Sequence, residues 1–195
     1  MRVLKLTVPT LVGVLVIGAA GCQMTTQTVR LDPPVKLQPG EDASGTVVGL
    51  AVIDIRGDQQ LGTIEDAAGT TFPVRTAEGS AAAINQRVSE ALTRKGFKVK
   101  PLSDDDPASL VVELRELRYG SKKDRYDWGL SLGASVSAKA KNGLETYART
   151  FNLAQEKGMG RPPTEKDSTY WVNEGVAQAL DDMLNDAELL NMLRH

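Results

Sequence analysis

Cysteine and histidine are nearly missing from this chain of 195 residues. The single cysteine, Cys22, excludes an internal disulfide and any zinc site built from several cysteines. The single histidine, His195, is the last residue, where chains commonly fray, so mechanisms that need a positioned imidazole have little support. We therefore expect no metal site and no cofactor.

An excess of basic residues is also lacking. Lys and Arg number 23 against 25 Asp and Glu, which gives a formal net charge of −2. Because nucleic-acid binders neutralise phosphates with Lys and Arg, we expect no nucleic-acid partner. Hydrophobic residues make up 41% and charged residues 25% of the chain, as in ordinary globular proteins. These proportions exclude full disorder and a polytopic membrane protein.

The one long uncharged run lies at the N-terminus, at residues 6–20, and follows Arg2 and Lys5. As a helix it would rise only about 22 Å, short of the ~30 Å hydrocarbon core of a bilayer. A positive segment followed by a short apolar segment is typical of a secretory signal. We therefore assign residues 1–21 to a signal peptide.

The signal ends in Ala19-Ala20-Gly21-Cys22, which resembles the bacterial lipobox. In such precursors the Cys thiol receives a diacylglyceryl group, the chain is cleaved before the Cys, and the new amine is acylated. Leu is more usual than Ala at position 19. The alternatives are a plain secretory signal with an incidental Cys, or an uncleaved anchor. Because the sole Cys stands where acylation needs it, we predict lipidation at Cys22.

Several acyl chains hold a protein stably on a membrane without spanning it. In enterobacteria-like sorting, an Asp after the acylated Cys retains the protein in the inner membrane, and here Gln23 follows. We therefore predict an outer-membrane anchor with the protein facing the periplasm.

The mature chain divides into a tether and one domain. Residues 22–45 carry the acylated Cys and an extended tether, in which Pro33, Pro34 and Pro39 forbid a helix. Part of this tether could still dock as an edge strand. Residues 46–195 form a single periplasmic domain.

Hydrophobic patterning predicts the first half of this domain. Residues 46–56 are apolar on both faces, as in a central strand, and residues 57–75 form a loop with a short hairpin. A helix begins at Ser80 and ends at Gly96. A short strand follows at residues 97–102. In the next strand, from residue 110, a shift in the alternation predicts a β-bulge near Arg115-Glu116.

The second half contains a strong hairpin signal. Residues 128–140 alternate apolar and small or polar residues, and Asn142-Gly143 is typical of a two-residue type I′ turn. That turn places Ala138 opposite Tyr147 and leaves Arg149 as the exception on an apolar face. A last helix is expected to be capped by Asp167 or Ser168 and to break at Asn185-Asp186 before a terminal turn.

The element order predicts an α+β fold. We expect two layers, in which two helices pack on one face of a mostly antiparallel sheet of about five strands.

Two patterns suggest catalysis or ligand binding but have simpler interpretations. Gly129-Leu130-Ser131-Leu132-Gly133 matches the hydrolase elbow motif, and Ser131, Asp181 and His195 follow the hydrolase order. The motif, however, lies inside an alternating strand rather than at a strand-to-helix turn, so we predict no catalytic residues and no enzyme. Three consecutive acids at residues 104–106 lack calcium-loop spacing and indicate a solvated turn.

Two groups of residues are candidates for binding. Asp54 and Arg56 share one face at the end of the first strand, where they could bind a ligand or form an ion pair. Lys122, Lys123 and Arg125 accompany aromatic residues at a loop, where they could contact anionic headgroups or glycan, or be ordinary solvated charges.

Five features occur in order along the chain: the lipobox, Val52–Asp58 followed by Leu61-Gly62, Arg94–Val99, Lys141–Gly143 and Asp186–Leu190. Together they resemble the YajG-like lipoprotein family over nearly the whole mature chain. The resemblance implies an outer-membrane lipoprotein with a compact two-layer domain and no established activity. It implies no functional residue beyond Cys22.

We therefore expect a non-catalytic, membrane-anchored protein that binds an envelope partner, whether protein, lipid or glycan, or assists envelope assembly. The alternatives are a carrier of lipid or small ligands, including a transport-accessory lipoprotein, and an envelope hydrolase. A carrier needs an apolar cavity of several hundred Å³, and a hydrolase needs a convergent polar pocket. A partner-binding module needs an exposed apolar patch or an open sheet edge.

Overall fold

The computed structural model describes residues 25–36, 43 and 45–194, so Cys22, Pro39 and His195 lie outside the described residues. The elements run in the order β1 (Gln27–Val29), β2 (Val47–Asp54), β3 (Gln60–Glu65), β4 (Thr71–Thr76), α1 (Ser80–Arg94), β5 (Lys98–Pro101), β6 (Ala108–Lys123), β7 (Trp128–Asn142), β8 (Glu145–Met159), α2 (Glu165–Leu184) and α3 (Ala187–Arg194).

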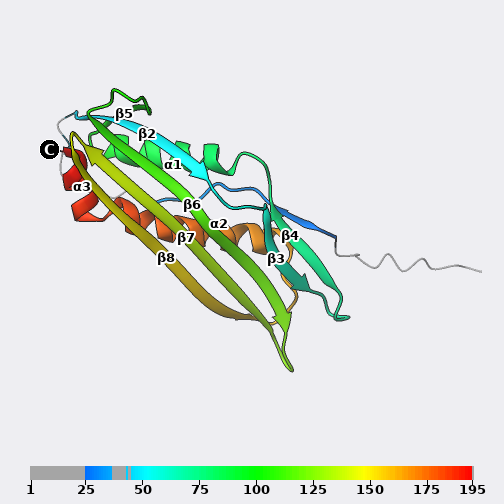
Figure 1. Ribbon diagram of the computed structural model, residues 1–195. Coiled ribbons are helices and arrows are strands. Elements are labelled where there is room, and N and C mark those ends of the chain that lie inside the picture. The colour runs from blue at the N-terminus through cyan, green and yellow to red at the C-terminus, as the bar shows by residue number, and fades with distance from the viewer. Residues whose placement is uncertain (1–24, 37–42, 44, 195) are drawn as a thin grey trace, which may run out of the picture.

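The main sheet has five strands in the order β5-β2-β6-β7-β8, and the helices cover one of its faces (Figure 1). β2 pairs in parallel with β5 and β6, whereas β6, β7 and β8 form antiparallel pairs. The α+β class and the five strands are confirmed. The sheet is therefore mixed rather than mostly antiparallel, since two of its strand pairs are parallel and two are antiparallel. The parallel pairs arise because α1 returns the chain to β5, which runs parallel to β2.

The number of helices was predicted wrongly as two. The described residues contain three, because the expected terminal turn is the helix α3. Its first turn is capped by Asp186, whose Oδ1 accepts a hydrogen bond from the Leu189 N–H at 2.8 Å. The predicted break at Asn185-Asp186 is confirmed as the junction between α2 and α3.

A second, three-stranded sheet has the order β1-β4-β3. β3 and β4 form the short hairpin expected in residues 57–75. β1 comes from the segment predicted as a tether and pairs in parallel with β4 as an edge strand. Val29 and Leu31 of this segment are buried, and Asn173 of α2 donates a hydrogen bond to the Arg30 carbonyl at 2.9 Å. Part of the segment therefore belongs to the folded unit.

The predicted β-bulge is confirmed, since the register between β6 and β7 shifts between Leu114 and Glu116. The predicted hairpin register is wrong by two residues. Asn142 pairs with Glu145, so the loop is Gly143-Leu144, and Ala140 rather than Ala138 lies opposite Tyr147.

The shift has a tertiary cause. The Asn142 side chain donates a hydrogen bond to the Met192 carbonyl of α3 at 3.1 Å, which holds Asn142 in the strand. Gly143, at φ +57°, starts the loop instead. A shift of two residues keeps each side chain on its predicted face.

The predicted cap of α2, Asp167 or Ser168, is also wrong. Thr164 is the N-cap, and its side chain and the Asp167 side chain form a capping box. Ser168 is buried, and its hydroxyl contacts Gln27 Oε1 at 2.5 Å and the Tyr119 hydroxyl at 3.2 Å. It therefore ties α2 to β1 and β6 rather than capping the helix.

Candidate functional site

The face of the main sheet opposite the helices carries an exposed apolar surface. β2 lies between β5 and β6, as predicted for a central strand, but the helices cover only one of its faces. Val48 and Leu50 point into the core, while Val47, Ile53 and Ile55, which alternate with the core positions, are 41–45% exposed. We call Val47, Ile53, Ile55 and Leu102 the apolar stripe. The sequence carried this signal, but two apolar faces were interpreted as two buried faces.

Leu102 joins the stripe because the loop after β5 folds over Gly49. A Cβ at Gly49 would overlap the Asp106 carboxylate and lie 3.2 Å from Leu102 Cδ1. Glycine at this position therefore permits the close approach of the loop. Leu102 itself is 41% exposed, so it covers Gly49 without leaving the surface.

Charged residues lie within and beside the apolar stripe, since Asp106 covers Gly49 between Val47 and Ile53, while Lys100 and Glu113 flank β2 on the neighbouring strands. Asp106 is buried, pairs with Lys100, and accepts a hydrogen bond from the Ser103 N–H at 2.8 Å. The hydrogen bond from Lys100 and that from Ser103 lower the pKa of Asp106. The solvated turn predicted for residues 104–106 is thus wrong for Asp106. On β6, Glu113 pairs with Arg115 at 3.7 Å.

Asp54 and Arg56 form the predicted ion pair. Arg56 Nη2 lies 2.6 Å from Asp54 Oδ2, and Arg56 Nε lies 2.8 Å from Asp54 Oδ1. Nη2 also donates to Thr76 Oγ1 of β4 at 3.2 Å. Burial raises the pKa of Asp54, but the hydrogen bonds and charge of Arg56 outweigh it and hold the pKa below its ordinary value. Since the Arg56 side chain is only 6% exposed, the pair joins β2 to β4 and offers a ligand little access.

The predicted basic cluster lies at the other end of the β3–β4 hairpin. Lys123 Nζ donates to the Ala67 carbonyl at 3.0 Å and lies 5.4 Å from the Trp128 ring. The Arg125 guanidinium lies 5.6 Å from the Tyr126 ring. Lys122 is exposed.

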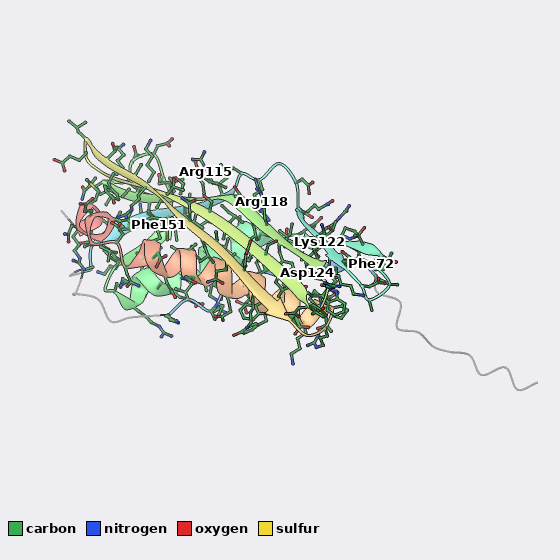
Figure 2. All side chains as sticks on the ribbon, turned by 90° about the horizontal axis from the view of Figure 1, so that it is seen from below. Phe72, Arg115, Arg118, Lys122, Asp124 and Phe151 are labelled. Carbon is green, nitrogen blue, oxygen red and sulfur yellow. The ribbon has the colours of Figure 1, made fainter. Side chains whose placement is uncertain are left out.

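Figure 2 shows Lys122 and Asp124 at one end of the molecule near Phe72 of β4, with Phe151 toward the opposite end. Lys123 contacts Ala67 in the β3–β4 loop, whereas Arg56 contacts Thr76 at the far end of β4. The structure therefore does not bring Lys122, Lys123 and Arg125 together with Asp54 and Arg56. The two groups contact opposite ends of one hairpin and form no common site.

The hydrolase-like residues are separated by the sheet. Ser131 is the fourth residue of β7 and lies opposite Gly120 and Glu156. Its side chain points to the helix-free face, because its neighbours Leu130 and Leu132 are buried. Asp181 belongs to α2 on the other face, where its carboxylate accepts a hydrogen bond from the Lys36 N–H at 2.8 Å.

Several hollows open on the described surface, with volumes from about 190 to about 1240 Å³. An apolar cavity of about 190 Å³ lies between α2 and the sheet, with Tyr119, Leu132, Lys157 and Trp171 in its wall. A larger open groove of about 1240 Å³ separates residues 30–34 from α1 and α2 and has many charged residues in its wall.

The described residues contain no group of three or more side chains placed to hold a metal ion. Nor does any helix among them have the length and apolar character needed to cross a bilayer.

Comparisons with known proteins identify a family and similar folds. A family model described as uncharacterized lipoprotein matches residues 33–194. Protein XCC0632 from Xanthomonas campestris has a similar structure, with a TM-score of 0.58 and 12% identity, over 85% of this chain and 97% of that one. A second solved structure, of an uncharacterized protein, gives a TM-score of 0.51 and 10% identity, over 83% and 98%. At these identities the likeness shows the fold alone. No curated protein matches the sequence.

Proposed function

The chain belongs to the uncharacterized lipoprotein family, and from that membership we propose a non-catalytic protein, anchored to the outer membrane, that binds an envelope protein through its apolar stripe. Membership of a lipoprotein family implies a lipid anchor. Attachment at Cys22, the outer membrane, the periplasmic orientation and the narrower YajG-like assignment belong to our proposal.

The exposed apolar stripe is the observation that carries the proposal. Large aliphatic side chains gathered on one surface gain free energy when a partner removes them from water. The stripe lies on the face that no helix of the described residues covers. The solvent-accessible charges at its border include the acidic Glu113 as well as the basic Lys100 and Arg115, and a protein surface can match both signs, whereas an anionic lipid surface favours basic residues alone.

The alternatives have weaker support. Ligand pockets usually hold about 300–1,000 Å³. The apolar cavity between α2 and the sheet, at about 190 Å³, falls below that range, and the larger hollows, of about 560–1240 Å³, have many polar and charged residues in their walls, so a carrier of whole lipids is less well supported. A hydrolase would need Ser131 and Asp181 on one surface, and the sheet lies between them. In the enzyme case, Ser131→Ala would abolish function in a folded protein, and we expect it to be silent.

Cross-linked complexes captured from intact cells test the partner site. We expect the variant Ile53→Ser/Ile55→Ser to lose the envelope proteins that co-purify with the wild type. Leu144→Ser is the matched control, because Leu144 is an exposed leucine in the β7–β8 loop. Capture of the same proteins by the stripe variant would contradict the proposal.

The anchor has a separate test. Cys22→Ser should release the protein from the membrane fraction. The intact mass of the membrane-extracted wild type should include the acyl chains and lack residues 1–21. A mass without acyl chains would contradict lipidation at Cys22.

A further inference from the structure

We propose that β8 pairs in antiparallel register with β8 of a second copy, about a two-fold axis at Phe151. The surface involved is the edge of the main sheet and is distinct from the apolar stripe. β8 is the last strand in the sheet order, spans the 15 residues Glu145–Met159, and pairs only with β7 among the described residues (Figure 1).

The two edges of the main sheet differ in how they are protected. Natural proteins block open edges with short strands, prolines, bulges or charges. β5, at the other edge, has four residues and ends in Pro101. β8 has no proline, and its register with β7 continues without a bulge from Glu145 to Met159. Charge is the remaining device, and β8 carries Glu145, Arg149, Glu156 and Lys157. The edge is therefore open to a strand whose charges complement these.

One hydrogen bond shows which backbone N–H and C=O groups of β8 point away from β7. The Gly143 N–H donates to the Pro107 carbonyl at 2.9 Å, so Ala108 and Asn142 form a non-hydrogen-bonded pair between β6 and β7. The backbone groups of Asn142 then face β8, where they bond to Glu145.

Alternation along β8 directs the backbone groups of every even-numbered residue away from β7. These residues are Thr146, Ala148, Thr150, Asn152, Ala154, Glu156 and Gly158. Apart from Glu156, these residues have small or uncharged side chains. Their side chains therefore do not block another strand from reaching the outward-pointing N–H and C=O groups.

Charge complementarity selects one register. With Phe151 on the axis, Glu145 of each copy lies opposite Lys157 of the other, and both side chains are exposed in the monomer. The same register puts the outward-facing residues opposite one another in hydrogen-bonded pairs and opposes no like charges.

The neighbouring registers are less favourable. An axis at Asn152 places Lys157 opposite Tyr147 and loses both charge pairs. An axis at Leu153 places Lys157 opposite Arg149, which opposes like charges.

α2 lies beside this edge, on the helix side of the sheet. α2 packs on both β7 and β8, where Gln178 accepts a hydrogen bond from Gln155 at 2.8 Å. Lys157 Nζ lies 3.8 Å from the Trp171 ring of α2, which positions the cation on the helix side of β8 beside the second copy.

Self-association of the full acylated chain in detergent tests this pairing. Two differently tagged copies are mixed, and their co-purification is measured over a range of protein concentrations. We expect the wild type to co-purify and Lys157→Glu or Glu145→Lys alone to weaken co-purification by about tenfold or more, because each change opposes like charges twice. Mixing the two variants with each other should restore co-purification, since both cross-pairs are then of unlike charge.

Glu156→Lys is the matched control. Glu156 neighbours Lys157, is equally exposed, and faces Thr146 of the second copy, so this change should leave co-purification within about twofold of the wild type. Circular dichroism of each variant checks that it is folded. A monomeric wild type, charge variants that still associate, or a mixture that does not recover association would each overturn the proposal.

Discussion

Arg149 and Asp186 form an ion pair in which Arg149 Nη1 lies 2.5 Å from Asp186 Oδ2. Arg149 is the charged exception on the helix-facing side of β8, and Asp186 is the residue that ends the α2–α3 junction. Asp186 Oδ1 also accepts hydrogen bonds from the Leu189 N–H at 2.8 Å and the Tyr147 hydroxyl at 3.2 Å. One carboxylate therefore caps α3 and docks it on β8.

The variant Asp186→Ala should lower the free energy of unfolding by about 1–3 kcal/mol, because it removes a helix cap and hydrogen bonds to a charged group. Arg149→Ala should cost less, since the Arg149 side chain is 58% exposed whereas that of Asp186 is 4% exposed. Urea unfolding measures both. An equal or larger loss for Arg149→Ala would contradict this account of the junction.

The capping box of α2 predicts a pH dependence. The hydrogen bond from Arg161 and those from Thr164 outweigh burial and lower the pKa of Asp167 from 3.8 to about 2. Because the folded-state pKa is the lower one, the carboxylate stabilises the fold above about pH 4, and this contribution disappears as the pH falls through 2. Asp167→Asn should therefore reduce stability at neutral pH and flatten its decline between pH 4 and 2.

The pH dependence is measured by urea unfolding at several pH values. Asp104→Asn removes an exposed carboxylate outside any helix cap and should keep the wild-type slope. An unchanged slope in Asp167→Asn would show that the capping box does not govern acid stability.

Gly143→Val should destabilise the domain by about 1–3 kcal/mol, because valine adopts a positive φ only with strain. The φ of Gly143 is +57°, and a Cβ there would meet no atom within 4 Å, so the cost comes from the backbone rather than from a clash. Leu144→Ala, at the neighbouring loop position, should change stability by no more than about 0.5 kcal/mol. Similar losses for both variants in thermal unfolding would contradict the backbone explanation.

Tyr147 and Thr146 test which face of β8 is covered. Tyr147 packs against the core and donates a hydrogen bond to Asp186, whereas Thr146 is exposed. Tyr147→Ala should cost about 2 kcal/mol or more, and Thr146→Ala about 0.5 kcal/mol or less. A larger loss for Thr146→Ala in chemical denaturation would mean that the opposite face is buried.

The parts of the fold that follow from local periodicity were predicted from the sequence. The alternation in residues 128–140 assigned the core face of β7, and its disturbance near Arg115-Glu116 located the β-bulge. Gly96, at φ +92°, follows the end of α1 where a terminating glycine was expected. Each of these properties depends on neighbours within a few residues.

The wrong predictions of the hairpin register, the α2 cap and the burial of β2 have different causes. The hairpin register depends on the long-range bond from Asn142 to Met192, which no local pattern shows. The cap of α2 did have a local signal, since Thr164 stands three residues before Asp167. The exposure of the apolar stripe depends on whether a second layer covers β2, and only the tertiary structure contains that information.

In-cell photo-crosslinking from the apolar stripe tests the central claim most directly. A photoreactive amino acid replaces Ile53 in one strain and Ser131, an exposed residue on the same helix-free face, in another. We predict a discrete adduct with another envelope protein from position 53 and none from position 131. No adduct at position 53, or the same adducts from both positions, would contradict the claim that the apolar stripe binds a partner.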